Sequence, residues 1–164
     1  MKKSLVTFSV FYACFAQGGA ASAATATSTM NVSTTVQSVC VTSANDLSFG
    51  AYDPTASSPT DATTTISITC TSGTNFSVGL NQGTASGATV TARKMTNGSN
   101  LLGYTLYSDS SRSTNWGNTV GTDTPAQITA GSSPSLLTVY GRIAPQQNVP
   151  SGTYSDVVTV TVTY

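Results

Sequence analysis

The chain has 164 residues, only 7% of them charged, and it contains no histidine. Without the first 23 residues, which we expect to be removed, four basic residues face six aspartates and the net charge is −2. So few cations cannot form a basic patch for nucleic acid or an anionic membrane, and a Ser-His-Asp hydrolase is excluded because its base is missing.

Residues 1–23 have the pattern of a secretory signal peptide. Lys2 and Lys3 give a positive start, residues 5–16 are mainly apolar, and Ala21-Ser22-Ala23 forms an A-x-A cleavage site. Cleavage after Ala23 or after Ala24 fits this pattern, and lipidation at Cys14 is a weaker alternative. No other stretch approaches the ~18 apolar residues that a membrane span needs. We therefore expect an exported protein that is not inserted in a membrane.

The next segment, from Ala24 to Cys40, alternates between two kinds of side chain. Its even positions from Met30 onward are Met30, Val32, Thr34 and Val36, whereas the odd positions from Thr25 to Gln37 are all polar. A period of two residues is typical of a strand with one buried face. The chain end repeats the pattern, with Val158, Val160, Val162 and Tyr164 in one row and Thr159, Thr161 and Thr163 in the other. We therefore predict a strand at each end of the mature chain.

Between these ends, short alternating runs are separated by Gly, Pro, Asn, Asp and Ser clusters. Asn97-Gly98 predicts a type I′ hairpin turn. The predicted strands include 47–49, 66–70, 76–80, a weaker one within 88–95, 102–107, a short one around Ile128, and 137–143. No window has a helical period of useful length. About seven to nine short strands in a chain of this length predict an immunoglobulin-like β-sandwich.

Two cysteines remain after removal of the signal, Cys40 and Cys70. In an exported chain they predict one disulfide, which the chain-entropy model values at roughly 3–4 kcal/mol. A metal site is the rival interpretation, but two thiolates without histidine are too few ligands. We expect no metal and no cofactor.

The remaining residues give little support for catalysis. The aspartates lie mostly in turn contexts, where they cap the backbone, and no phosphate-binding glycine loop is present. Trp116, with Tyr104 and Tyr107, could form a surface aromatic platform for a sugar. The alternative is that Tyr104 belongs to the core and Trp116 covers one end of the sandwich. We predict that the chain is not an enzyme.

Several longer pieces resemble the spore coat protein U family, which includes the pilins of archaic chaperone–usher pili. The resemblance covers the mature chain from end to end and in order. Its pieces are Leu47-Ser48-Phe49-Gly50-Ala51-Tyr52, Ile66-Ser67-Ile68-Thr69-Cys70, Leu102-Gly103-Tyr104-Thr105-Leu106-Tyr107-Ser108-Asp109 with Trp116-Gly117, Val139-Tyr140-Gly141-Arg142-Ile143, and Val149-Pro150-Ser151-Gly152-Thr153-Tyr154-Ser155-Asp156.

The resemblance implies an all-β fold, an incomplete immunoglobulin-like β-sandwich completed by donor-strand complementation. A periplasmic chaperone would lend a strand, an outer-membrane usher would catalyse assembly, and the next subunit's N-terminal segment would then fill the groove. Residues 24–36 would be the donor strand, which inserts Met30, Val32, Thr34 and Val36, and residues 37–164 the pilin domain. The groove and chaperone contact would lie along Val158, Val160, Val162 and Tyr164. The other wall stays open between the strand near Cys40 and Leu47–Phe49.

The leading hypothesis is therefore a structural subunit of a surface pilus that serves adhesion and biofilm formation. It implies a homo-polymer formed by strand exchange, no nucleic-acid partner, and export through the periplasm to the cell surface or into the medium. The alternatives are a surface- or glycan-binding module with loops around Trp116, and a protective coat protein of the same fold. A stable monomer, whose N-terminal strand folds back into its own groove, is a further alternative.

Overall fold

The computed structural model describes residues 22–164, so the predicted signal peptide and Cys14 lie almost wholly outside the described residues. The chain divides into one unit that ends at Thr35 and a second that runs from Val36 to Tyr164. Residues 22–39 contain no strand, and the side chains of Met30 and Val32 are 84% and 82% exposed. Within residues 22–164, no helix has the length and apolar composition needed to cross a membrane.

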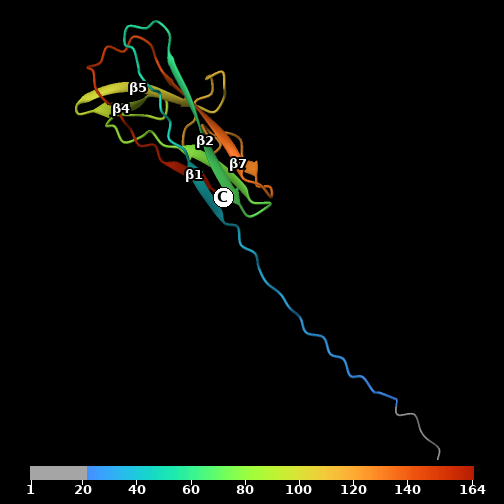
Figure 1. Cartoon of the computed structure of the whole chain (residues 1–164). Coiled ribbons are helices and arrows are strands. Elements are labelled where there is room, and N and C mark those ends of the chain that lie inside the picture. The colour runs from blue at the N-terminus through green and yellow to red at the C-terminus, as the bar shows by residue number, and fades with distance from the viewer. Residues whose placement is uncertain (1–21) are drawn as a thin grey trace, which may run out of the picture. The chain divides into compact units, whose positions relative to one another are not determined.

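The second unit is built from antiparallel strands (Figure 1). Five of them form one sheet in the order β1-β2-β7-β5-β4, and three form a smaller sheet in the order β6-β3-β8. The strands are β1 (Cys40–Ala44), β2 (Thr60–Cys70), β3 (Asn75–Leu80), β4 (Arg93–Asn97), β5 (Asn100–Tyr107), β6 (Ile128–Thr129), β7 (Ser135–Ile143) and β8 (Val160–Thr163). The predicted all-β sandwich is confirmed.

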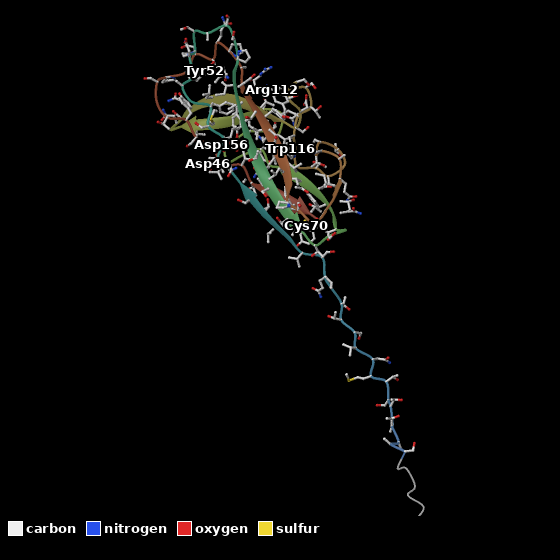
Figure 2. All side chains as sticks on the ribbon, turned by 45° about the vertical axis from the view of Figure 1, so that its right-hand side comes forward. Asp46, Tyr52, Cys70, Arg112, Trp116 and Asp156 are labelled. Atoms are coloured by element: carbon white, nitrogen blue, oxygen red, sulfur yellow. A yellow bond between two sulfur atoms is a disulfide. The ribbon has the colours of Figure 1, made fainter. Side chains whose placement is uncertain are left out.

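The predicted disulfide is present and joins β1 to β2. Cys40 and Cys70 are directly opposite each other in the antiparallel pairing, and their sulfur atoms are bonded. Cys70 is labelled in Figure 2, near the point where β1 begins. The bond therefore ties the edge strand β1 to its only pairing partner among the described strands.

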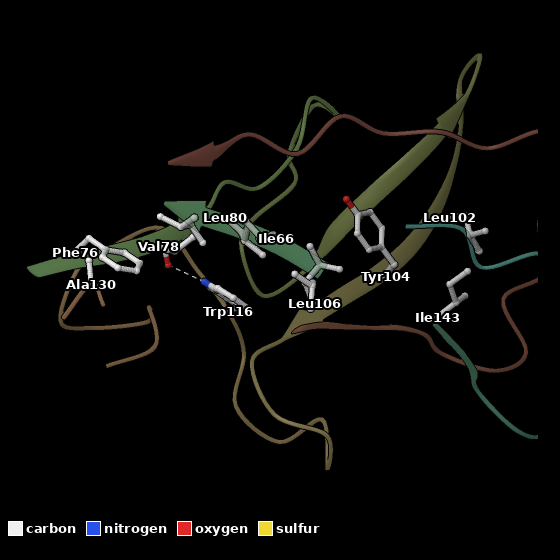
Figure 3. Close-up of a cluster of buried hydrophobic side chains, with 12 residues drawn as sticks. Ile66, Phe76, Val78, Leu80, Leu102, Tyr104, Leu106, Trp116, Ala130 and Ile143 are labelled. Atoms are coloured by element: carbon white, nitrogen blue, oxygen red, sulfur yellow. Dashed lines mark hydrogen bonds between the residues drawn. The ribbon is translucent and has the colours of Figure 1, made fainter. Parts of the chain in front are cut away.

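The core lies between the two sheets and follows the alternation in the sequence. Leu102, Tyr104 and Leu106 of β5 are buried, and Phe76, Val78 and Leu80 of β3 face them from the smaller sheet (Figure 3). Ile66 and Ile68 of β2 and Val139 and Ile143 of β7 complete the cluster. Each of these sets occupies alternate positions of its strand and therefore one face of its sheet. In β3 the other face is buried as well, at Ser77 and Gly79.

Two local predictions were wrong. Leu47–Phe49 is irregular rather than a strand, and the second concerns a turn. Residues 24–39 form no strand within their own chain, and their pairing with another copy stays a prediction. The β4–β5 turn has Gly98 and Ser99 at its centre, because Asn97 pairs with Asn100. Only Gly98 has a positive φ there, of 60°, which fits a type II′ turn and not the predicted type I′ turn.

Candidate functional site

A long groove runs along one side of the sandwich, between the segment 44–54 and the segment 149–160. It consists of two adjoining hollows of about 420 and 600 Å³, which share Leu47, Phe49, Met95 and Tyr154 as lining residues. The floor of the first hollow is the core itself, with Ile66, Leu80, Tyr104, Leu106 and Val139. The groove therefore reaches down to the core, whose floor side chains are themselves only 1–6% exposed.

One wall of the groove is the C-terminal segment, which alternates strictly in burial. Tyr154, Asp156, Val158, Val160 and Val162 are half-buried, whereas the odd-numbered residues between them are exposed. Val158, Val160 and Asp156 line the first hollow. The side chains of these even-numbered residues, here called the even row, therefore face inward, and Thr159 and Thr161 between them face away.

The main chain of this wall has one free side. Ser155 exchanges two main-chain hydrogen bonds with Thr96 of β4, and the carbonyl of Thr159 accepts one from Asn81. In an antiparallel strand, the N–H and C=O groups of alternate residues point to opposite sides. Those of the even row therefore point away from β3 and β4, and no described residue pairs with the main chain of Val158. The result is an open strand edge along the groove.

The opposite wall is the segment that follows β1. Between Asp46 and Ala51 the main chain forms no hydrogen bond with another main-chain group of the described residues. Leu47 and Phe49 point inward, and the Phe49 ring meets that of Tyr104 edge-on, with 6.1 Å between ring centroids. They pack over Gly141 of β7, where an added Cβ would lie 2.7 Å from both side chains. The sequence did not decide which of two segments forms this second wall, and the structure shows that Leu47 and Phe49 line it.

Tyr52 anchors the end of this segment. Its hydroxyl accepts a 2.7 Å hydrogen bond from the N–H of Gln147 and donates one of 3.0 Å to the carbonyl of Ala144. Gln147 in turn donates to, and accepts from, the main chain of Gly103 in β5. These bonds hold the wall in place although its own main chain has no strand partner.

A polar pair interrupts the apolar lining of the groove. The hydroxyl of Tyr104 donates a 2.7 Å hydrogen bond to Oδ2 of Asp156, and the hydroxyl points toward the red C-terminal segment in Figure 3. Oδ1 of Asp156 accepts from the N–H groups of Thr84 and Val157 and from the Thr84 hydroxyl. Sequence reasoning missed this pair, although an aspartate inside an alternating apolar row was the available signal.

The electrostatics of the pair follow from these bonds. Burial alone would raise the pKa of Asp156, but the hydrogen bonds from Thr84 and Tyr104 lower it below its ordinary value. For Tyr104, burial and then the bond to the carboxylate raise the pKa of the phenol well above its ordinary value. At neutral pH the pair is therefore a carboxylate that accepts and a neutral phenol that donates.

Trp116 does not form a surface platform for a sugar, so that interpretation is wrong. Its side chain is 1% exposed, and its indole N–H donates a 2.8 Å hydrogen bond to the carbonyl of Val78 (Figure 3). The apolar ring displaces water from the core while the bond satisfies its one polar group. The alternative, in which Tyr104 belongs to the core and Trp116 covers one end of the sandwich, agrees with the burial of both side chains.

The predicted acceptor residues Val158, Val160 and Val162 lie in the even row, and Tyr164 follows them as an exposed residue. The predicted donor residues Met30, Val32, Thr34 and Val36 are all exposed. In residues 22–164, no group of three or more His, Cys, Asp or Glu side chains is placed to hold a metal ion.

Comparison with known proteins gives concordant results. The model of the Spore Coat Protein U domain family matches residues 26–161. The chain is 36% identical over 159 residues to Protein U of Myxococcus xanthus, and the match covers 88% of each chain.

A solved structure also shares the fold. It is one chain of the CsuC–CsuE chaperone–tip adhesion subunit pre-assembly complex, from the archaic chaperone-usher Csu pili of Acinetobacter baumannii. The TM-score is 0.55 at 24% identity, over 79% of this chain and 40% of that one. This chain thus spans less than half of the length of that chain. The likeness confirms the predicted incomplete immunoglobulin-like sandwich.

Proposed function

The chain belongs to the Spore Coat Protein U domain family, and we propose that it is the structural subunit of a surface pilus assembled by donor-strand exchange. Members of this family are structural proteins rather than enzymes, and so is this chain. In the proposed fibre, residues 24–36 of one copy fill the groove of the next. The fibre would serve adhesion and biofilm formation.

The observation that carries the proposal is the match between the groove and the exposed N-terminal segment. The groove offers an open strand edge and an apolar floor, and the segment offers an unpaired alternating row. Adding a strand to such an edge supplies main-chain hydrogen bonds, while alternate side chains enter the groove. Burial of Met30, Val32 and Val36 would contribute on the order of 5–8 kcal/mol, and each hydrogen bond about 1 kcal/mol.

The same groove explains the partners that we propose. An open edge beside an apolar floor is prone to aggregation, so a subunit needs a temporary strand before assembly. The Csu complex, with which the chain shares its fold, contains a chaperone and a subunit before assembly. This supports a periplasmic chaperone that covers the groove and an outer-membrane usher that replaces it with the next donor. The disulfide supports export into an oxidising compartment.

The test is electrophoresis in SDS without boiling, on protein exported from cells that also express the neighbouring genes. We compare the wild type with Val32→Asp/Val36→Asp, in which charges enter the inward row. The matched control is Ser33→Asp/Thr35→Asp, which adds the same charges to the outward row. We expect a heat-sensitive ladder in the wild type and in the control, and monomer in the inward-row variant. A wild-type monomer that is folded and soluble without a chaperone would contradict the proposal.

A protective coat protein is the second candidate, and the family description and the likeness to Protein U favour it. It would use the same strand exchange, so electrophoresis does not separate it from a pilus. Electron microscopy of cells that express the chain does. We expect thin fibres extending from the surface, whereas a continuous layer would favour the coat.

A further inference from the structure

We propose that Thr34 of one copy docks opposite Asp156 of the next, with the donor antiparallel to the C-terminal wall, and that this polar contact sets the register of the fibre. This inference rests on the proposed strand exchange. It assigns a specificity-determining role to Thr34 and to the Tyr104–Asp156 pair. Both rows, donor and acceptor, have one polar position among apolar ones.

The acceptor row is polar at one place only. From Tyr154 to Val162 its groove-facing side chains are aromatic or aliphatic except for Asp156. Asp156 Oδ1 accepts three hydrogen bonds, but Oδ2 accepts only the one from Tyr104. A carboxylate oxygen has two lone pairs and a phenol oxygen has acceptor capacity beyond its donated proton. A hydroxyl that enters the first hollow here therefore finds an acceptor.

The donor row has the complementary pattern. Met30, Val32 and Val36 are apolar, and Thr34 alone brings a hydroxyl, with one proton to donate. If Thr34 faced a valine, its hydroxyl would be buried without a partner, which is unfavourable. If an apolar donor residue faced Asp156, the carboxylate would be covered without a new hydrogen bond. Both penalties disappear when Thr34 is opposite Asp156.

The antiparallel direction also accounts for the rest of the row. With Thr34 opposite Asp156, Val36 meets Tyr154, Val32 meets Val158 and Met30 meets Val160. A shift by two residues toward the C-terminus of the acceptor places Thr34 on Val158 and Val36 on Asp156. A shift in the other direction places Val32 on Asp156. Of these three antiparallel registers, only the proposed one avoids a mismatch at Asp156.

The parallel direction fits less well. With Thr34 opposite Asp156, Val36 would meet Val158, Ser38 would meet Val160, and Met30 would meet Gly152. Val162 would then need Cys40, which is held in β1 of its own subunit by the disulfide. The first hollow, beside Val158 and Val160, would receive one apolar side chain instead of two.

Paired cysteines test the register directly. Opposite residues of a hydrogen-bonded antiparallel pair have Cα atoms about 5.5 Å apart, within the range of a disulfide, whereas diagonal neighbours exceed it. We compare three full-length double variants, expressed with the neighbouring genes. Val32→Cys/Val158→Cys reports the proposed register, Val32→Cys/Val160→Cys the shifted one, and Val36→Cys/Val158→Cys the parallel one.

We expect a covalent ladder that survives boiling without reductant in the first variant, and little in the others or in the single-cysteine chains. Preferential cross-linking of either other pair would overturn the proposed register. Unboiled wild-type samples on the same gel distinguish a failure of strand exchange from an error in the proposed register. No wild-type ladder means that strand exchange itself fails, whereas a wild-type ladder with the wrong cross-link means that only the register is wrong.

A second variant tests the polar contact. Thr34→Val makes the donor more apolar, so simple burial predicts a more resistant polymer. The proposed contact predicts the opposite, about a tenfold faster loss of polymer in SDS at fixed temperature, because the carboxylate is buried without its donor. Thr35→Val, the same change on the outward row, should leave this rate unchanged. A Thr34→Val polymer as resistant as the wild type, or more so, would overturn the role of the contact.

Discussion

The two sides on which the sheets approach each other differ sharply. On one side, here called the closed seam, the segment Asn115–Gly117 joins the two sheets. The main-chain N–H of Trp116 donates a 2.9 Å hydrogen bond to the carbonyl of Leu106 in β5, and the carbonyl of Gly117 accepts one of 2.8 Å from the N–H of Leu80 in β3. The other side is the groove described above, here called the open seam. There the main chains of Val158 and of Asp46–Ala51 have no main-chain partner among the described residues. The core is thus bordered on one side by a segment that pairs with both sheets and on the other by a groove with unpaired main-chain edges.

A buried arginine stabilises the closed seam. Arg93 is fully buried, and its guanidinium donates hydrogen bonds of 2.6–2.9 Å to the carbonyls of Leu80, Asn81, Val90 and Trp116. Burial lowers the pKa of Arg93, and its guanidinium supplies a donor to each of the four carbonyls. Sequence reasoning missed this role, since an arginine beside a lysine in a weak strand candidate resembles a solvated position.

The difference between the seams teaches that the groove does not result from a shortage of apolar side chains. Both seams border the core. At the closed seam the Asn115–Gly117 segment pairs with β5 and β3, whereas at the open seam the main chains of Val158 and of Asp46–Ala51 pair with no main-chain group of the described residues. The open seam lacks one strand. Substitutions at the closed seam should therefore change the stability of the subunit, and substitutions at the open seam should mainly change assembly.

The largest effect should come from Trp116→Ala. It removes the largest fully buried side chain and the hydrogen bond to Val78, so we expect a loss of about 3–5 kcal/mol in the free energy of unfolding. Urea denaturation of the purified subunit measures it. Leu136→Ala, at a residue that is 70% exposed, is the control and should stay within about 0.5 kcal/mol. If the urea midpoint of Trp116→Ala equalled that of the wild type, the closed seam would not stabilise the subunit, which would contradict the proposed difference between the seams.

A smaller effect on the subunit is expected from Val160→Thr, at the open seam. The side chain is half-buried in the groove wall, so the free energy of unfolding of the subunit should fall by less than about 1 kcal/mol. The polymer should lose more, because the donor strand would bury the new hydroxyl. The unboiled ladder measures this, with Thr161→Val on the exposed row as the control. Equal effects on subunit and polymer would contradict the proposed division.

The smallest effect concerns pH and Asp156. Because its pKa in the folded chain lies below the ordinary value of 3.8, the unfolded chain binds more protons as the pH falls through this range. Its stabilisation is therefore fully present above pH 3.8 and is lost as the pH falls through the lowered pKa. Asp156→Asn should make the acid limb of the stability curve less steep, as measured by urea denaturation from about pH 5 to pH 2. An unchanged slope would show that the hydrogen bonds to Asp156 do not stabilise the subunit.

The strands with strict alternation were predicted well, because burial on one face imposes a period of two. This holds for β3, β5 and β7, for which the predicted inward residues are in the core. Leu47–Phe49 was wrongly predicted as a strand for a related reason: its apolar side chains are inward, but its main chain has no neighbour. Alternation of apolar side chains indicates which side chains are buried, but a strand also needs a neighbouring main chain with which to form hydrogen bonds.

The sequence by itself determined the class of fold, the disulfide and the two alternating rows at the ends of the mature chain. These depend on local composition and spacing, which side-chain burial and cysteine chemistry translate directly into structure. Only the tertiary structure decided that Trp116 and Arg93 close one seam, that Leu47 and Phe49 line the other, and that Asp156 meets Tyr104. These contacts join residues far apart in the chain, and which main-chain groups stay unpaired depends on how the sheets come together.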